Sequence, residues 1–325
     1  MKKFIHINAR TIDEAVLTLK RYGKRAKAIA GGTDLLGVMK DEILPEYPEA
    51  VVNIKTIPGM DFIHQDNGVL KIGALTRLQD IAESPNIREH YLALAESARR
   101  TGSTHIREMG TIGGNICQDI RCWYYRYPNN RFPCLRKGGG RCYAIEGDNR
   151  YHSIFGGSVE GGCYAVHPSD TAPALVALGA RIKTSKRTVK AEDFFSVDVC
   201  KTTILDDDEL VTEIQIPKLP AGSKSAFVKF ALRKSIDFPI VNCAVLLTTS
   251  GEKVTHARIC LNAVYVKPYR ATLAEQAIVG KNLNEVNADT AAEMAVAEAK
   301  PLTHNRYMIE IAKSLAKRAI LACKP

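Results

Sequence analysis

GTIGGNICQ (Gly110–Gln118) and YAVHPSDTAPALVAL (Tyr164–Leu178) enclose the stretch that decides the fold. Within it lie five of the nine cysteines of the chain: Cys117, Cys122, Cys134, Cys142 and Cys163. The stretch is rich in Gly, Arg, Tyr and Asn and lacks the apolar periodicity of a helix or a strand. A long loop of this kind in a compact domain is either functional or disordered, and the clustered cysteines favour a functional loop.

The overall composition is that of an ordinary globular protein, with 46% hydrophobic and 25% charged residues, and 325 residues are enough for two or three domains. The N-terminal MKKFIHINAR has no apolar segment after its lysines, so it does not look like a signal peptide. No run approaches the roughly 20 apolar residues of a membrane span. These features predict a cytoplasmic protein, in which clustered cysteines bind metal or act in catalysis rather than form disulfides.

The net charge of +10 comes from 45 Lys and Arg residues that are interleaved with 35 acidic residues, without a dense basic tract. No helix-turn-helix, zinc-finger or RNP pattern is present, so nucleic acid is not an expected partner. The basic balance instead favours docking of acidic partner subunits or of an anionic substrate.

Two glycine turns are candidates for binding a dinucleotide. AKAIAGGTDLL (Ala26–Leu36) begins as a short strand, turns at Gly31–Gly32 and continues with Thr33-Asp34, which can cap a helix. Only glycine lets a phosphate approach the main-chain N–H groups closely. TIGGN follows about eighty residues later, and the two turns together could hold the two ends of one dinucleotide, although each alone is as consistent with an ordinary turn. Neither is a GxGxxG or Walker A motif, so neither a Rossmann nor a P-loop fold is indicated.

The rest of the chain alternates helix and strand patterns. Helices are expected over 11–22, 76–83, 87–100 and 172–178, and strands over 51–54, 180–184 and 207–217, with a hairpin over 62–75. After a linker at 218–225, strands are expected at 226–232, 241–248 and 257–263, and helices at 273–279, 288–298 and 305–321. This last block predicts a separate α+β domain that begins near Gly222.

Cys122, Cys134, Cys142 and Cys163 are separated by 12, 8 and 21 positions. Structural zinc sites usually contain short C-x2-4-C pairs, and these four cysteines form none. Wide spacing suits a [4Fe-4S] cubane, because each iron of this larger object needs one thiolate. The Arg, Lys and Gly residues of 136–141 suit an anionic cluster whose sulfurs accept hydrogen bonds from a flexible backbone.

The remaining cysteines carry weaker signals. Cys117 follows a glycine turn five residues before Cys122 and stays open as a ligand. Four cysteines in apolar contexts are expected to be ordinary buried thiols: Cys200, Cys243, Cys260 and Cys323.

Five segments resemble a known family in order and spacing. They are AGGTDLL (Ala30–Leu36), TIGGN (Thr111–Asn115), SDTAPAL (Ser169–Leu175), DDELVTEIQIP (Asp207–Pro217) and SAFVKFALRKSIDFPIV (Ser225–Val241). Together they resemble the FAD-binding medium subunit of the xanthine dehydrogenase family of molybdenum hydroxylases.

This resemblance implies an α+β fold class. A two-part FAD-binding domain of the PCMH, or vanillyl-alcohol-oxidase-like, fold is expected over 1–217, with parts 1–55 and 56–217. A C-terminal α+β domain similar to that of the carbon monoxide dehydrogenase flavoprotein is expected over 222–325.

The resemblance also implies the residues that contact FAD. The loop 29–36 would wrap the pyrophosphate with backbone N–H groups, and TIGGN would form the second clamp. Asp170 would bond the adenosine end and Lys229 would lie near the isoalloxazine, although the residue pattern alone suggests a solvated strand lysine at position 229. The expected contacts are Ile29, Ala30, Gly31, Gly32, Thr33, Asp34, Leu35, Leu36, Thr101, Thr111, Ile112, Gly113, Gly114, Asn115, Asp170, Val211 and Lys229.

Most members of the family join the TIGGN and SDTAPAL segments by a short connection, whereas this chain inserts roughly forty residues at about 117–163. The insertion resembles that of the 4-hydroxybenzoyl-CoA reductase beta subunit, which carries an extra [4Fe-4S] cluster. It implies metal ligation by Cys122, Cys134, Cys142 and Cys163. The segment between the last two of these cysteines is longer here, which leaves the substrate of the complex open.

The implied function is that of an oxidoreductase subunit that relays electrons between [2Fe-2S] centres and an external carrier, ferredoxin or NAD. Its expected partners are a small subunit with two [2Fe-2S] clusters and a large subunit with the molybdenum cofactor, in a dimer of heterotrimers. No catalytic residue for the substrate is expected in this chain. Two alternatives remain: an FAD subunit of a purine or aromatic N-heterocycle (xanthine-type) dehydrogenase that uses NAD, and a zinc-stabilised binding module.

Overall fold

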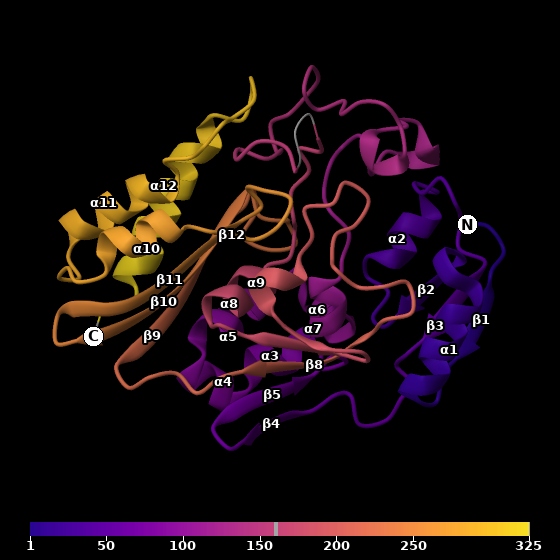
Figure 1. The fold of residues 1–325 in the computed structure, drawn as a ribbon, viewed down its shortest axis with the longest axis horizontal. Coiled ribbons are helices and arrows are strands. Elements are labelled where there is room, and N and C mark those ends of the chain that lie inside the picture. Colours follow the sequence, from indigo (N-terminus) through magenta and orange to yellow (C-terminus); the bar gives the residue numbers. More distant parts are fainter. Residues whose placement is uncertain (159–161, 325) are drawn as a thin grey trace.

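Three β-sheets follow one another along the chain in the computed structural model, which describes residues 1–158 and 162–324 (Figure 1). The first sheet is parallel with the order β1-β3-β2; the second and third are antiparallel, with the orders β4-β5-β8-β6-β7 and β12-β11-β10-β9. The strands are β1 (Ile5–Asn8), β2 (Ala26–Ile29), β3 (Ala50–Asn53), β4 (Ile63–Asp66), β5 (Val69–Gly73), β6 (Arg181–Thr184), β7 (Thr188–Lys190), β8 (Val211–Ile216), β9 (Ser223–Phe230), β10 (Val241–Ser250), β11 (Lys253–Asn262) and β12 (Tyr269–Arg270).

The helices are short and lie between or beside these sheets. They are α1 (Ile12–Tyr22), α2 (Leu35–Lys40), α3 (Leu78–Glu83), α4 (Pro85–His90), α5 (Leu92–Arg99), α6 (Thr104–Met109), α7 (Ile112–Ile116), α8 (Thr171–Ala177), α9 (Ala191–Phe194), α10 (Thr272–Ile278), α11 (Glu285–Ala295) and α12 (Tyr307–Leu321), with 3-10 turns η1 (Gly23–Arg25), η2 (Pro128–Asn130) and η3 (Leu135–Lys137). In the described part of the chain, no helix combines the length and the apolar character that crossing a membrane requires.

The N-terminal unit is a small parallel sheet with α1 packed on it, and its caps follow the sequence. Thr11 Oγ1 accepts a hydrogen bond from the Glu14 amide at 3.1 Å, and Gly23 ends the helix with φ of +56°. The central strand β3 is buried over Ala50–Val52 because both neighbouring strands and α1 cover it. Strand β2 then leads directly into the first glycine turn.

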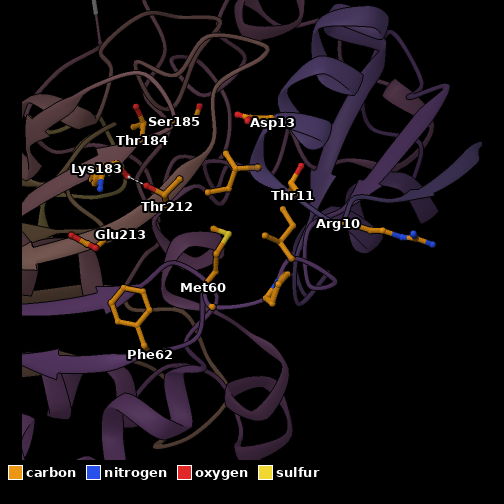
Figure 2. Close-up of a pocket in the computed structure, with 14 residues that line it drawn as sticks. Arg10, Thr11, Asp13, Met60, Phe62, Lys183, Thr184, Ser185, Thr212 and Glu213 are labelled. Carbon is orange, nitrogen blue, oxygen red and sulfur yellow. Dashed lines mark hydrogen bonds between the residues drawn. The ribbon is translucent and has the colours of Figure 1, made fainter.

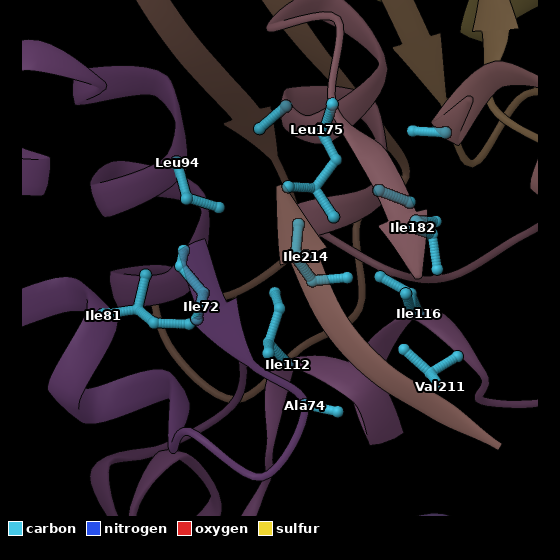
Figure 3. Packing of buried hydrophobic residues seen from close by; sticks show 14 of the residues in the cluster. Ile72, Ala74, Ile81, Leu94, Ile112, Ile116, Leu175, Ile182, Val211 and Ile214 are labelled. Carbon is cyan, nitrogen blue, oxygen red and sulfur yellow. The ribbon is translucent and has the colours of Figure 1, made fainter. Parts of the chain in front are cut away.

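The second sheet forms the main core with the helices that pack on it (Figure 3). Ile72 of β5 and Ile214 of β8 are fully buried, as are Ile112 and Ile116 of α7. Their apolar contacts hold α7, and with it the second glycine turn, against the sheet.

The third sheet lies between two layers of helices. On one side α10 and α12 pack on β11 and β10, and on the other α5 and α8 of the preceding unit pack on β9, β10 and β11 (Figure 1). This two-sided burial explains the continuous apolar run Cys243–Leu247. Cys243, Cys260 and Cys323 are buried here as expected, whereas Cys200 is exposed, because it lies in a surface loop where its amide donates to Asp198 Oδ1 at 2.7 Å.

The cysteine-rich insertion extends from beside α2 toward the C-terminal unit (Figure 1). At one end the Asn129 amide donates to the carbonyl of Asp41, just after α2, at 2.7 Å. At the other end Asn305, before α12, donates to the carbonyl of His152 at 2.9 Å. The insertion therefore bridges the first and last units of the chain.

Several elements differ from the sequence expectation. The helix expected over 87–100 is two helices, α4 and α5, because the backbone of the buried Tyr91 leaves the helical region (φ −134°, ψ 48°). Strands β1, β7 and β12 and helix α6 were not expected. All four are short, so a periodic pattern had little length in which to develop.

Candidate functional site

The first glycine turn presents a row of unused backbone donors. Within the described residues, the amides of Ala30–Asp34 donate to no protein acceptor. Gly32 has φ of +71°, which a side chain would disfavour. Consecutive N–H groups in such a turn form a concave anion site, so the expected pyrophosphate loop has the donors that it needs.

The two glycine segments lie against each other at Gly31 and Met109. A Cβ atom at Gly31 would stand 2.0 Å from the Met109 carbonyl oxygen, a distance that no real side chain tolerates. Gly110 is also close, because a Cβ there would lie 3.7 Å from Thr33 Oγ1. The structure therefore joins the two turns that the sequence places about eighty residues apart.

The second glycine segment uses its amides internally. Ile112 and Gly113 donate to the carbonyls of Thr76 and Ala74, both at 2.9 Å, while Gly114 and Asn115 donate to Thr111. The glycines are instead required for packing, since a Cβ at Gly113 would stand 2.9 Å from the Ala74 carbonyl oxygen. This segment supports the first loop and has no amide row of its own to offer.

Asn115 connects this segment to the SDTAPAL motif. Its Oδ1 accepts hydrogen bonds from the hydroxyls of Ser169 and Thr171, both at 2.6 Å. The Ser169 carbonyl accepts a further bond from Asn262 Nδ2 of β11 at 2.7 Å. All four side chains are buried, which fixes the start of α8 between the first domain and the third sheet.

Asp170 and Lys229 form a buried ion pair. Lys229 Nζ donates to Asp170 Oδ2 at 2.6 Å, Asn242 Nδ2 donates to Oδ1 at 2.7 Å, and the two charged side chains are only 6% and 4% exposed. Burial raises the pKa of Asp170 above its ordinary value, although Lys229 and Asn242 stabilise the carboxylate. The resemblance assigned Asp170 to the adenosine end and Lys229 to the isoalloxazine; the structure pairs the two side chains with each other, and their contacts with FAD stay a prediction.

The other two expected contacts lie nearby. Lys229 Nζ also donates to the carbonyl of Arg100 at 2.9 Å, which places Thr101 next to the ion pair. Val211 is 6% exposed and belongs to the core that contains Ile112 and Ile116 (Figure 3).

The four cysteines of the insertion converge. Burial raises the pKa of Cys122, and the nearby thiols of Cys163 and Cys142 raise it further. Burial also raises the pKa of Cys163 to about 11, and the thiols of Cys142 and Cys134 add to this rise. Each of the four thiols thus lies near enough to at least two others for its charge to matter. Cys117 stands apart, because burial alone raises its pKa to about 12 and it packs on the main core instead.

The surroundings of these thiols suit an anion. Backbone amides of Tyr125 and Tyr124 oppose the rise in the pKa of Cys122, and those of Arg136 and Lys137 act likewise on Cys134. Lys137 Nζ is buried and has no hydrogen-bond partner in the described chain. A buried ammonium without an anion is costly, so this one points to a negative group between the thiols.

Asp34 ties the first glycine turn to the insertion. Its carboxylate accepts from Arg126 Nη1 at 2.8 Å, from Arg121 Nη2 at 2.9 Å and from the Asp119 amide at 2.9 Å. Burial alone would raise the pKa of Asp34, but Arg126 and Arg121 lower it below its ordinary value. The side chain of Asp34 therefore holds the base of the insertion, while its amide remains in the donor row.

Two cavities accompany these residues. One of about 580 Å³ lies between the start of α1 and the edge of the second sheet, with Arg10, Asp13, Lys183 and Glu213 among its walls, and contains none of the expected FAD contacts (Figure 2). The other, of about 670 Å³, lies between the insertion and the β9–β10 loop. Cys122 and the exposed side chains of Trp123 and Phe238 line it.

Sequence reasoning missed the residues that join distant segments. Asn242 and Asn262 adjoin the apolar segments Cys243–Leu247 and Ile259–Leu261, which signals a buried polar role but does not identify a partner. Arg121 and Arg126 flank Cys122 in RCWYYR but gave no sign that they bond Asp34. His152, which contacts Cys122, is a single histidine in a loop without a pattern.

An anion-binding glycine turn, a two-part domain behind it and a third sheet that closes on it through a buried ion pair define the class: a dinucleotide-binding redox subunit. The chain belongs to the family described as FAD binding domain in molybdopterin dehydrogenase, whose model matches residues 2–219. The C-terminal part matches the CO dehydrogenase flavoprotein C-terminal domain over residues 226–323. Together with the observed mixture of helices and strands, these matches confirm the expected fold class.

Relatives along the whole chain agree. The chain is 32% identical over 324 residues to the aldehyde oxidoreductase FAD-binding subunit PaoB of Escherichia coli (strain K12), covering 96% of each. It is 28% identical to the carbon monoxide dehydrogenase medium chain of Hydrogenophaga pseudoflava, covering 98% of this chain and 96% of that one. A solved structure of the latter enzyme without the Mo-pyranopterin moiety matches with a TM-score of 0.77 and 26% identity, over 99% of this chain and 97% of that chain. The protein is therefore the FAD subunit of a multi-subunit oxidoreductase of the molybdenum hydroxylase family.

Proposed function

We propose that this subunit carries a [4Fe-4S] cluster in addition to FAD, and that it relays electrons between the [2Fe-2S] centres of a partner subunit and an external carrier, as in the 4-hydroxybenzoyl-CoA reductase type. The ligands would be Cys122, Cys134, Cys142 and Cys163. The observation that carries the proposal is the proximity of these thiols, three of which share one small cluster, to the ammonium of Lys137, which has no hydrogen-bond partner among residues 1–158 and 162–324.

The arrangement of the thiols favours a cluster over a single ion. A zinc ion holds its thiolates about 2.3 Å from one centre. Within residues 1–158 and 162–324, no group of three or more His, Cys, Asp or Glu side chains is already placed to hold a metal ion. The thiolates of a cubane stand farther apart, because each binds a different iron. The wide spacing of the four cysteines along the chain, without a short C-x2-4-C pair, therefore supports the larger centre and weighs against a zinc-stabilised module.

The charge and polarity around the thiols support the same centre. Cys134 and Cys163 are buried in a small apolar cluster with Ile120 and Tyr125, so water has little access. Backbone amides and the Lys137 ammonium supply the positive potential that an anionic cluster requires in such surroundings. The Arg136 guanidinium adds to this potential, because it lowers the pKa of Cys163 while it donates to the Val199 carbonyl at 2.7 Å.

For FAD, the open amide row at Ala30–Asp34 would hold the pyrophosphate, and the expected contacts at 29–36, 101, 111–115, 170, 211 and 229 remain our proposal for the site. When bound, FAD supplies exchange between two-electron and one-electron carriers, and the cluster supplies one-electron transfer. The chain's own task is to position the two groups and to set their electrostatic surroundings. We propose domain limits of 1–217 and 222–325 for this arrangement.

The proposed partners are a small subunit with two [2Fe-2S] clusters and a large molybdenum-cofactor subunit, in a dimer of heterotrimers in the cytoplasm. The relatives named as a medium chain and as an FAD-binding subunit support a multi-subunit complex. The external carrier would be ferredoxin or NAD.

The test is a count of cofactors in the purified complex and in cysteine variants. We expect about four irons in this chain beyond those of its partners, as one cubane requires, together with one FAD. Cys122→Ser and Cys142→Ser should remove the extra iron and its EPR signal while FAD stays bound. Cys117→Ser is the matched control, because its thiol lies in the main core, and should keep both cofactors.

Zinc in place of iron, or iron that survives both ligand variants, would overturn the cluster. Loss of FAD with the iron would show that the insertion is part of the flavin site. Turnover with NAD but not with ferredoxin would favour the xanthine-type alternative for the external carrier.

A further inference from the structure

The imidazole of His152 is directed at the thiol of Cys122. Nε2 of His152 lies 3.2 Å from Cys122 Sγ, within the range of a hydrogen bond to sulfur, and the side chain of His152 is fully buried. Nδ1 has no hydrogen-bond partner among the residues that the structure describes. In that part of the chain, the sulfur is thus the ring's one hydrogen-bonding contact.

The position of His152 is set by the C-terminal domain as well as by the insertion. Asn305, buried at the start of the last helical segment, donates from Nδ2 to the carbonyls of His152 at 2.9 Å and of Ser153 at 3.0 Å. The His152 amide donates to the Asn149 carbonyl at 3.1 Å. Backbone held from both sides leaves the ring few ways to move, so its approach to the sulfur is built into the fold.

The ring also lies on the wall of the larger cavity, beside Cys122, Trp123 and Tyr151. Cys122 is therefore the thiol of the set that this cavity exposes to a neighbouring molecule or to water.

We propose that His152 sets the reduction potential of the cluster by donating a hydrogen bond from Nε2 to the Cys122 thiolate. The inference rests on the proposed cluster. Reduction adds negative charge that is shared with the ligand sulfurs, and an N–H donor stabilises the reduced form more than the oxidised form. His152 thereby raises the potential and favours the cluster as an acceptor of electrons. It is a positioning residue, since it acts through Cys122.

The experiment compares His152→Leu, which removes the donor at similar volume, with His152→Gln, whose amide can restore it. His256→Leu, at an exposed position of β11, is the control. In the purified complex we would measure iron content, the potential of the cluster by EPR-monitored redox titration, and the coupling of exchangeable protons by ENDOR after transfer to D2O. We expect full iron in all variants, a more negative potential and one fewer coupled exchangeable proton in His152→Leu, and values near the wild type in His152→Gln and His256→Leu.

An unchanged potential in an iron-replete His152→Leu variant would overturn the inference and leave the cluster itself intact. Loss of iron in both His152→Leu and His152→Gln would overturn it too, because the ring would then serve assembly or ligation. Absence of the extra iron in the wild type is a separate result, which removes the proposed function and the inference with it.

Discussion

Asp34 and Arg126, 92 residues apart in the sequence, form a two-pronged ion pair, with Nη1 2.8 Å from Oδ1 and Nη2 3.2 Å from Oδ2. Asp34 ends the open amide row of the flavin loop, and Arg126 lies four residues beyond Cys122 in the insertion. Arg121 donates to the same carboxylate, so that two guanidinium groups share one negative charge. The flavin loop and the base of the cysteine insertion are therefore mechanically joined, and a change in one must be felt by the other.

Replacing Asp34 by Asn should loosen the insertion. Asp34→Asn leaves Arg121 and Arg126 close together with no anion, and removal of one partner of a mostly buried pair costs about 3 kcal/mol. The only tryptophan of the chain, Trp123, lies between the two arginines and reports local unfolding by fluorescence. We expect the fluorescence transition in urea to move to lower concentration and FAD to bind more weakly, whereas Asp61→Asn, at an exposed position, should change neither. Equal midpoints for wild type and Asp34→Asn would show that the ion pair does not hold the insertion.

The same pair predicts a dependence on pH. Because the folded-state pKa of Asp34 is lowered, its contribution to stability is fully present above the ordinary value of about 3.9 and is lost as the pH falls through the folded-state value. The difference in urea midpoint between wild type and Asp34→Asn should thus stay constant from about pH 5 to 8 and shrink below about pH 4. A difference that instead shrinks between pH 6 and 8 would assign the effect to another group.

Gly31→Ala should weaken FAD binding without unfolding the protein. The new methyl group would stand 2.0 Å from the Met109 carbonyl oxygen, so the two glycine segments must separate. Overpacking of this kind costs about 1–3 kcal/mol, which corresponds to a Kd raised about 5- to 150-fold if the strain is felt in the bound state. Titration of the deflavinated subunit with FAD, followed by flavin fluorescence, measures this Kd. Gly37→Ala is the matched control, because a Cβ there meets no atom within 4 Å and sits in α2, and its FAD affinity should be unchanged. Equal affinities for the two variants would contradict the close contact.

The local parts of this architecture could be predicted from the sequence because their determinants are neighbours. Helix α1 begins after Thr11 and ends at Gly23, as expected. The β4–β5 hairpin turns at Asn67-Gly68, where both residues have positive φ. The glycine turn after β2 could likewise be predicted, because a strand, two glycines and a helix cap follow one another directly in the sequence. The family resemblance, together with the cysteine spacing, predicted Cys122, Cys134, Cys142 and Cys163 as ligands, which remains a prediction. It left Cys117 open, and the structure packs this residue on the main core.

The long-range parts could not be predicted, because nothing in a single sequence links their partners. Asn242 and Asp170 meet across 72 residues, and Asp34 and Arg126 across 92. A polar residue in an apolar segment of a strand predicts a buried hydrogen bond, but it does not identify the partner. The use of the second glycine segment as packing rather than as a donor row was hidden for the same reason, since it depends on Ala74 and Thr76.

Variants of the buried pair Asp170–Lys229 should affect the stability of the protein and its affinity for FAD in different ways. Lys229→Met leaves the buried Asp170 carboxylate without its cation and should cost about 3–5 kcal/mol of unfolding free energy. Asp170→Asn leaves the Lys229 ammonium beside a neutral carboxamide. The double variant removes both charges and should recover much of this loss, a coupling that a double-mutant cycle in urea detects. If both residues contact FAD, affinity for FAD should stay low in all three variants. Lys224→Met, on the exposed part of the same strand, is the control, and strictly additive losses of stability would contradict the ion pair.

Lys137→Met should have opposite effects on the empty and the loaded protein. The buried ammonium has no hydrogen-bond partner in the described chain, so removing its charge should stabilise the subunit without metal, by about 1–3 kcal/mol if the group is charged there. With the cluster in place the same ammonium faces thiolates of Cys134 and Cys122, and its loss should speed the release of iron to a chelator. Urea midpoints of the iron-free chain and rates of iron loss measure the two effects separately, with Lys40→Met, at an exposed position, as the control. If Lys137 were simply a poorly placed surface lysine, both measurements would match the control. If Lys137 paired with an ordinary carboxylate, the iron-free Lys137→Met variant would be less stable than the wild type. Only a more stable iron-free chain together with faster iron loss identifies Lys137 as the counter-charge of an anionic cluster.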